Sequence, residues 1–215
     1  MFKRAGFAAA MLFLLTSAGF SQDDGRLDVS LGAAGLFPKQ TTANGIVQKP
    51  TKSGAFLGTV RWRFSAKQSM EANVARGNDS QIYSTPFSFR IQSHVTEFSA
   101  AYVFRPIETK RFEPFLLAGA GVLIFSPFNT FIDTVQVPVP SVRQNEPAFL
   151  YGGGVDYEVF SQIPFIRRSA LAPYLALRLQ YRGLLYKAPN FKNPSLFTGS
   201  QEHTAEAAAG IVFKF

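Results

Sequence analysis

The sequence contains no cysteine, and this absence excludes several classes of protein and site. A disulfide scaffold, a thiol nucleophile and a cysteine-ligated metal all need that residue, and so does a lipid-modified N-terminal cysteine. Histidine is nearly as scarce, with two residues in a chain of 215, so catalysis by an imidazole has only two candidates. A chain that is exported without disulfides needs stability from another source, such as a closed, fully hydrogen-bonded sheet.

Long apolar runs are also absent after the first 20 residues, so no membrane-spanning helix is expected there. The N-terminus begins with a short basic stretch (residues 1–4), followed by an apolar stretch (residues 6–15) and then by small residues. This order is typical of a secretory signal peptide, and the apolar stretch is shorter than the roughly 20 residues of a spanning helix. We therefore expect residues 1–21 to be a signal peptide for Sec-dependent export, cleaved after Ser21 or, as a second choice, after Ala18. A retained N-terminal anchor is the alternative.

The formal net charge is +8, but the basic residues are scattered along the chain. Lys3 and Arg4 belong to the expected signal peptide, and later basic residues gather at most in short pairs such as Arg167 and Arg168. This distribution does not favour a nucleic-acid-binding protein, which gathers its basic residues on one face or one helix. Anionic lipid headgroups or polysaccharide are the partners that we expect for such charge.

The end of the chain alternates between apolar and other side chains up to the final residue. Ile211, Phe213 and Phe215 fall on one side and Lys214 on the other, which is the pattern of a β-strand. A soluble domain gains little from such an ending, because chain termini usually fray. A transmembrane β-barrel does gain, because its last strand must pair with its first to leave no open edge in lipid. The ending therefore favours a membrane barrel.

Seven further segments resemble strands, and most reach the roughly 9–11 residues that a tilted membrane strand requires. They are residues 27–37, 54–65, 69–76, 95–105, 112–125, 148–160 and 172–186. Segment 54–65 alternates most clearly, with Phe56 and Trp62 on one face and Arg61 on the other. Segment 69–76 is the shortest. Segment 112–125 is apolar or glycine on both faces, so its register cannot be assigned.

The connections between these segments alternate in length. The long ones are residues 38–53, 77–94, 126–147 and 187–202, and the shorter ones are residues 66–68, 106–111 and 161–171. A membrane barrel sorts its connections in this way, with long outer loops and short periplasmic turns. We therefore predict a single all-β domain over residues 22–215. It is an eight-stranded antiparallel transmembrane up-and-down barrel, with both termini on the side of the short turns.

The residues on the two faces of the strands indicate whether the inside or the outside of the barrel faces water. A soluble eight-stranded barrel is apolar inside, whereas a membrane barrel is apolar outside. Here the apolar rows carry more bulk than a narrow lumen could hold, and the polar rows carry charges that would be costly against lipid. The predicted lumen residues are Arg61, Arg63, Glu71, Glu97, Asp156, Glu158, Arg178, Arg182 and Glu206. We expect them to form an ion-pair network that plugs the lumen; a narrow or gated ion pathway is the alternative.

The two histidines are the candidate catalytic residues of the sequence. The expected topology places His94 and His203 at the outer rim, at the starts of the fourth and eighth strands and on opposite walls, so a shared dyad or metal site is not expected. Each could activate a nearby serine with Glu97 or Glu206 as the orienting acid. Strand parity places each histidine and its acid on opposite faces, which argues against this. We therefore assign no catalytic, cofactor-binding or metal-binding residue.

Segments 97–104, 113–121 and 211–215 resemble those of the small OmpA-like or OmpX-like outer-membrane β-barrels, and the resemblance extends over residues 27–215. It implies an integral protein of the bacterial outer membrane that is monomeric and has no cofactor. It also implies contacts with outer-membrane lipids and lipopolysaccharide, and insertion by the barrel-assembly machinery, for which Ile211, Phe213 and Phe215 would be the C-terminal signal.

Fold alone does not select an activity, because this group includes structural proteins, adhesins and a few enzymes. We expect a non-enzymatic barrel with a structural or adhesin-like role through its long extracellular loops. The longest loop, residues 126–147, carries Phe128, Phe131 and several valines, which suggests an adhesive tip or an extended strand pair above the membrane. A lipid-modifying enzyme with its site at the rim is the alternative, and a narrow channel is a third candidate.

Overall fold

The structure is a computed structural model that describes residues 26–84, 88–107, 109, 111–133, 135–137, 142–158 and 174–215. The expected signal peptide, residues 1–21, lies outside them. Within the described ranges the elements are β1 (Leu27–Pro38), β2 (Thr41–Ala43), β3 (Ile46–Pro50), β4 (Ser53–Arg63), β5 (Gln68–Ser84), β6 (Ser88–Phe104), β7 (Phe112–Ile132), β8 (Val135–Gln136), β9 (Gln144–Tyr157), β10 (Leu175–Lys187), the 3-10 helix η4 (Pro194–Leu196) and β11 (Gln201–Lys214). No helix in this part of the chain is long and apolar enough to cross a membrane.

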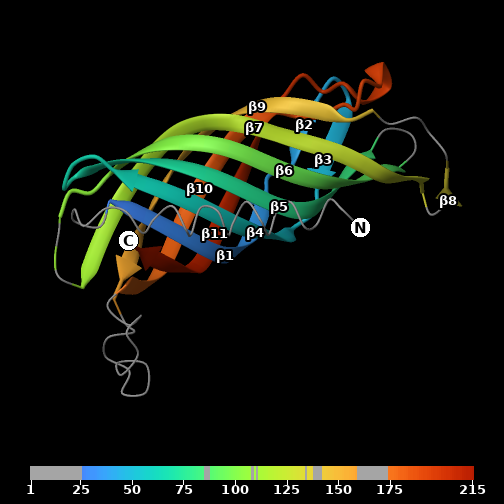
Figure 1. Ribbon diagram of the computed structural model, residues 1–215. Coiled ribbons are helices and arrows are strands. Elements are labelled where there is room, and N and C mark those ends of the chain that lie inside the picture. The colour runs from blue at the N-terminus through green and yellow to red at the C-terminus, as the bar shows by residue number, and fades with distance from the viewer. Residues whose placement is uncertain are drawn as a thin grey trace.

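Eight long strands close into an antiparallel barrel in the order β1, β4, β5, β6, β7, β9, β10 and β11 (Figure 1). The last strand returns to the first, with Val29 opposite Phe213. The backbone N–H of Phe215 donates to the carbonyl of Leu27 at 2.8 Å, so the wall is hydrogen-bonded up to the final residue. The predicted fold class and the pairing of the chain ends are confirmed.

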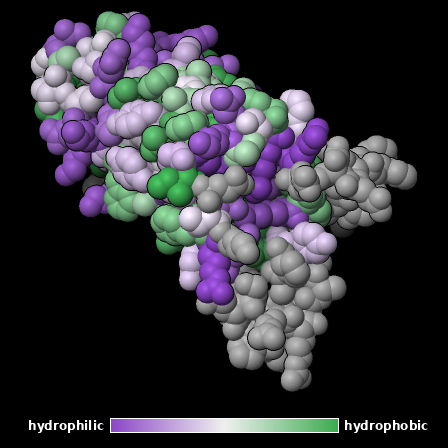
Figure 2. Space-filling model, turned by 90° about the vertical axis from the view of Figure 1, so that its left-hand side faces the viewer, coloured by the Kyte–Doolittle hydropathy of each residue, from purple (hydrophilic) through white to green (hydrophobic). Residues whose placement is uncertain are grey.

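Strand parity gives the barrel a polar inside and an apolar outside. Phe56 is 80% exposed and Trp62 57% exposed, whereas Arg61 beside them is 0% exposed. We call the outward apolar surface the apolar belt; on β5 it ends at Val74, and on β11 it begins at Ala205. In Figure 2 the green, apolar residues lie across the middle of the face shown, with purple, hydrophilic residues toward its ends.

The structure corrects the third predicted strand. Segment 69–76 is the start of β5, one of two strands of 17 residues that pair from Gln68 opposite Phe104 to Ser84 opposite Ser88. The expected long loop, residues 77–94, is therefore mostly a hairpin, whose turn lies outside the described residues. The prediction failed because the outward row turns polar after Val74, so the apolar alternation ends while backbone pairing continues.

The other outer connections also contain strands. In the first, β2 and β3 form a hairpin around Asn44 and Gly45, which both have positive φ angles, as a tight two-residue turn requires. In the connection after the fifth strand, β7 continues to Ile132 and pairs with β8. The expectation of an extended strand pair above the membrane thus holds for residues 126–132 and 135–136. The predicted strand ends at residues 158–160 and 172–174 lie mostly outside the described residues.

The register of β7 could not be assigned from its sequence, and the structure supplies it. Phe115 and Leu117 face the lumen, at 2% and 4% exposure, whereas Leu116 between them is 59% exposed. A bulge follows further along β7, because Pro127 pairs with Ser93 while Asn129 pairs with Gln92, the residue just before Ser93 in β6. The bulge re-aims the outer end of β7, as such irregularities commonly do at a barrel rim.

Candidate functional site in the barrel lumen

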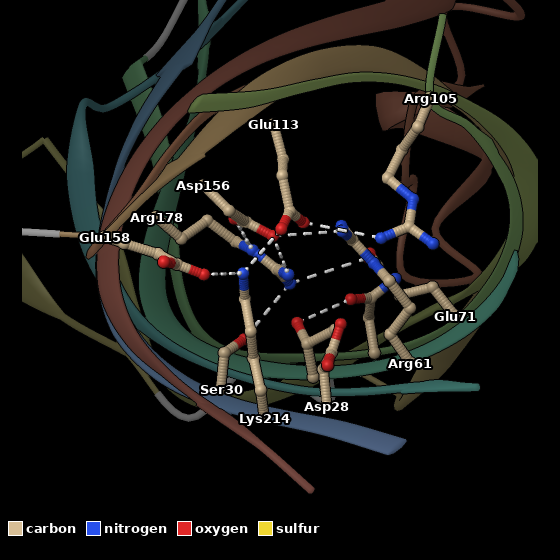
Figure 3. Close-up of polar contacts among 12 residues, drawn as sticks. Asp28, Ser30, Arg61, Glu71, Arg105, Glu113, Asp156, Glu158, Arg178 and Lys214 are labelled. Atoms are coloured by element: carbon tan, nitrogen blue, oxygen red, sulfur yellow. Dashed lines mark hydrogen bonds and ion pairs between the residues drawn. The ribbon is translucent and has the colours of Figure 1, made fainter. Parts of the chain in front are cut away.

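Four charged residues from four strands form the central group of the lumen. Arg61 on β4 lies 2.7 Å from Glu71 and 3.2 Å from Asp156. Arg178 on β10 lies 2.7 Å from Asp156, and Figure 3 shows the two guanidinium groups reaching toward the same carboxylates. The ring of Phe115 lies 4.2 Å from the Arg61 guanidinium. Because all four charges are buried, each would be costly without its partners.

A second charged group lies farther along the lumen. Arg182 of β10 is 0% exposed. It donates to Glu97 of β6 at 3.0 Å and to Glu206 of β11 at 2.7 Å. Glu97 also accepts a hydrogen bond from the Ser99 hydroxyl. One guanidinium therefore joins three strands from different sides of the barrel, which is the geometry in which its planar fork of donors is most effective.

A third charged group lies at the end where the chain termini meet the barrel. Arg63 lies 2.8 Å from Asp28, and Lys214 joins Glu113 at 2.7 Å to Glu158 at 3.0 Å. Glu113 also lies 3.4 Å from Arg105. The Glu158 side chain is 29% exposed, so this group is more accessible to solvent than the other two.

All nine predicted lumen residues lie on inward rows, but they divide among three groups instead of one network. The structure adds Asp28, Arg105, Glu113 and Lys214. Strand parity alone could have found Asp28 and Lys214, which alternate with apolar neighbours. Glu113 needed the register of β7. Arg105 is the last residue of the predicted segment 95–105 and has the parity of Glu97, so alternation could have found it as well.

The outer end of the lumen is closed differently, by the connection between β10 and β11. We call residues 188–200 the outer plug. Its Phe191 is 1% exposed and packs edge-on against Phe125 of β7, with ring centroids 6.3 Å apart. Gln144 at the start of β9 accepts hydrogen bonds from the backbone N–H groups of Asn190 and Phe191. The plug is therefore fixed by both apolar packing and backbone hydrogen bonds.

Polar side chains beneath the plug form a chain of hydrogen bonds. Gln48 of β3 donates to Gln81 of β5 at 2.9 Å, and Gln81 donates to Asp79 at 2.6 Å. Tyr83 donates to the carbonyl of Pro189 in the plug. The β2–β3 hairpin, the outer part of β5 and the plug are thereby held together.

Two buried acids of this region, both beyond the apolar belt, have no cation among their contacts within the described residues. Glu202 at the start of β11 accepts a hydrogen bond from Tyr186 at 2.8 Å, and burial raises the pKa of its carboxyl to about 8. Burial likewise raises the pKa of Asp79 to about 6. One carboxylate oxygen of each acid is buried without a hydrogen-bond partner. Removing water from an unpaired carboxylate favours its protonated form.

The space left inside the barrel is small. A cavity of about 40 Å³ lies beside the Arg182 group, lined by Glu97 and Glu206 of that group and by Asp79, Phe125, Tyr186 and other residues. A second, of about 10 Å³, lies beside Arg178 and Gln180. Such volumes hold a few water molecules at most. Within the described residues, no group of three or more His, Cys, Asp or Glu side chains could hold a metal ion.

The two histidines lie on outward rows, in strands on opposite walls. His94 contacts Asn78 through Nδ1 at 2.7 Å and stacks on Phe128. His203 contacts the Tyr151 hydroxyl at 2.9 Å. Within the described residues neither imidazole is hydrogen-bonded to a serine or a carboxylate. His94 is not at the start of its strand as expected, because β6 begins at Ser88.

The architecture has counterparts among solved structures. OprG, an outer membrane protein from Pseudomonas aeruginosa, matches with a TM-score of 0.58 and 13% identity over 89% of this chain and 96% of that one. Neisserial surface protein A matches with a TM-score of 0.53 and 14% identity over 88% and 97%. The chain has the fold of the small outer-membrane β-barrels.

The barrel also resembles Ail, the attachment invasion locus protein of Yersinia pestis, solved in complex with the heparin analogue sucrose octasulfate. The TM-score is 0.52 and the identity 14%, over 89% of this chain and 99% of Ail. No protein-family model and no curated protein sequence matches the chain. Identities this low support the fold, so the role of the barrel must be argued from its own residues.

Proposed function

We propose that the protein is a non-enzymatic integral outer-membrane barrel that conducts nothing and acts through its outer end. The observation that carries this proposal is the closure of the lumen at two levels. Arg182 bridges Glu97 and Glu206 across the interior, and Phe191 fills the mouth above them. An eight-stranded barrel is narrow enough to be filled by such side chains.

The apolar belt supports the membrane location. Large side chains such as Phe56 and Leu116 are exposed on it, which would be unfavourable for a protein surrounded by water. The charged groups lie inside, where they do not face lipid. The monomeric state and the use of Ile211, Phe213 and Phe215 as a signal to the barrel-assembly machinery are parts of the same proposal.

The outer end supports a surface-interaction role. The β5–β6 hairpin rises beyond the apolar belt, and its outward residues are mainly polar. Exposed basic residues are frequent there: Lys39, Lys49, Lys52, Arg76, Arg90, Arg143, Lys187 and Lys192. Such a surface attracts anionic polymers at long range. We therefore propose an adhesin-like contact with anionic polysaccharide.

A planar-bilayer recording tests the closed lumen. Purified protein is expected to give no conductance steps above those of the lipid alone. A variant that combines Arg182→Ala, Glu97→Ala and Glu206→Ala with a short Gly-Ser linker in place of residues 190–198 should conduct, because both levels of closure are removed. Steady conductance of the unmodified barrel would overturn the proposal in favour of a narrow channel.

Retention of cells on an immobilised sulfated polysaccharide tests the surface role. Cells that display the barrel should be retained, and retention should fall as salt is raised, because exposed charges are screened. Lys49→Glu with Arg90→Glu should abolish most of it. Lys67→Glu, at the opposite end of the barrel, is the control. Retention that is equal for both variants would contradict the adhesin-like role.

The enzyme alternative has its own test. Lipid from membranes that contain the barrel would be examined for loss of acyl chains, with His94→Ala and His203→Ala as variants. We expect the same lipid profile in all three cases. Acyl loss that depends on either histidine would replace the proposed role by a lipid-modifying activity.

A further inference from the structure

The outward wall of β9, β10, β11 and β1 contains a groove that interrupts the apolar belt. It has a volume of about 600 Å³ and is lined on the lipid side by Ala33, Gly153, Leu179, Tyr181, Ala207 and Ala209. The hollow arises because the outward row of β11 is reduced to alanine, with Ala209 opposite both Ala33 and Leu179. Leu179 and Tyr181, at 49% and 47% exposure, stand beside it.

A groove in this position is filled by lipid, since the belt faces hydrocarbon. An empty groove would cost its lining the dispersion contacts of one side. The alanine and glycine surface lets a chain approach the backbone closely, which is how shape selects partners in a membrane, where hydrophobicity itself does not. The choice among lipids therefore depends on the side chains at the end of the groove, where a lipid headgroup would lie.

The end of the groove toward the outer rim carries a pair of hydrogen-bonding side chains. The ring of Tyr151 lies over Gly183, where an added Cβ would come within 2.5 Å of it. The Tyr151 hydroxyl reaches His203 at 2.9 Å, and the two rings are stacked. Gly183 pairs with Ala205, directly above the groove. Polar atoms therefore begin where the alanine row ends.

Three lysines lie around this pair. Lys187 continues the outward row of β10, and Lys39 follows β1, where its backbone N–H donates to the carbonyl of His203 at 2.9 Å. Lys52 places its ammonium 5.9 Å from the centre of the Phe37 ring. The outward rows of β1, β10 and β11 carry no acidic side chain, since Glu202 and Glu206 of β11 face the lumen.

We propose that this groove binds a phosphorylated glycolipid of the lipid A type. One acyl chain lies against the alanine row, and a phosphate monoester lies among Lys39, Lys52 and Lys187, with sugar hydroxyls at His203 and Tyr151. A phosphate monoester carries a charge of about −1.5 to −2 at neutral pH. The phosphodiester of a glycerophospholipid carries a charge of about −1. Three ammonium groups with no competing acid favour the monoester. This inference rests on the proposed membrane location.

Native mass spectrometry of the barrel in detergent, titrated with bisphosphorylated lipid A, would test the site. A triple variant with Lys39→Gln, Lys52→Gln and Lys187→Gln should weaken binding at least tenfold. The control Arg76→Gln removes an exposed cation from β5, on another wall, and should change binding little. An equal loss in both variants would show diffuse attraction to the basic rim and overturn the site.

Variants that fill the groove test the acyl-chain contact separately from the contact between the phosphate and the lysines. Ala207→Phe with Ala209→Phe should weaken binding of lipid A, whereas Ala72→Phe on the outward row of β5 should not. Unchanged binding by the filled groove would overturn the placement of the acyl chain. Phosphatidylglycerol bound as tightly as lipid A would overturn the choice of lipid.

Each variant is first checked for a heat-dependent shift on a detergent gel, which reports a folded barrel. A folded barrel without lipid A selectivity contradicts the groove alone. A chain that does not fractionate with the outer membrane contradicts the proposed function instead.

Discussion

The two halves of the lumen are both closed, but by opposite means. In the inner half, every arginine contacts at least one carboxylate, as in the Arg61 group and the Arg182 group. In the outer half, Asp79 and Glu202 are buried beneath the apolar plug with amide and hydroxyl partners, and no cation of the described part of the chain contacts them. The inner half is closed by charge compensation, and the outer half by packing over acids that burial holds toward the neutral form.

This contrast separates a permanent closure from a conditional one. Removing a carboxylate from the inner network leaves an arginine without its partner at any pH, because arginine stays charged. The outer closure depends on the protonation of its acids, since ionisation there has no cation to balance it. Variants of the two halves should therefore differ in how much stability they cost and in whether that cost depends on pH.

Arg182→Met should give the largest loss of stability, about 3–5 kcal/mol, because it leaves Glu97 and Glu206 buried without a cation. Urea unfolding of the folded barrel in lipid vesicles would measure it. Adding Glu97→Gln and Glu206→Gln to the same variant should recover much of the loss. Failure of the recovery would mean that packing, and not charge, closes the inner half.

Phe191→Ala should cost about 3 kcal/mol, the usual range for removing a buried aromatic side chain. The effect should be confined to the outer half, so protease cleavage in residues 188–200 should rise while the gel shift of the barrel remains. Phe197→Ala, which removes a side chain with 46% exposure from the same connection, is the control. Equal protease sensitivity of the two variants would argue against the plug.

Stability should fall as pH rises from 6 to 8, because of Glu202. Its pKa in the folded barrel is raised to about 8, above its unfolded value, so the folded state holds a proton that the unfolded state has released. The expected loss over this window is about 2 kcal/mol. Glu202→Gln, which cannot ionise, should flatten the pH dependence measured by urea unfolding. An unchanged slope would remove Glu202 as its cause.

Glu158→Gln should have the smallest effect, below about 1 kcal/mol. Its side chain is 29% exposed, and Lys214 keeps Glu113 as a partner, so solvent screens what the pair contributes. The same unfolding measurement serves as a baseline for the inner half. A loss of stability as large as that of Arg182→Met would mean that solvent screens the rim charges no more than it screens the central ones.

The sequence predicted the parts of this barrel that follow from alternation. Closure between β1 and β11 and the inward side of residues such as Arg61 and Arg178 depend only on a period of two, which lipid on one side enforces. The lengths of β5 and β6 did not follow, because above the apolar belt the outward rows become polar. The inward row of β6 is apolar there, with Phe89 and Ile91, so the pattern that marks a lipid-facing strand is reversed. The role of Phe191 did not follow either, since nothing local distinguishes an apolar loop residue that packs inward.

The three lumen groups were predictable as residues but not as groupings. Parity places Glu97 and Glu158 on inward rows alike, yet Glu97 contacts Arg182 and Glu158 contacts Lys214. Which charges meet depends on the stagger of neighbouring strands, and the sequence does not give that stagger. The two acids without a cation were missed for a different reason, since Asp79 and Glu202 lie in segments expected to be loops.

The hydrogen bonds between Leu27 and Phe215 have a consequence for biogenesis. The wall has no closed subset of strands, because β1, the first strand of the barrel, is joined to β11, the last. A closed wall in lipid therefore needs both strands at once, so neither half of the barrel can close before the other is present. Loss of even the last few residues would leave an open edge on both β1 and β10.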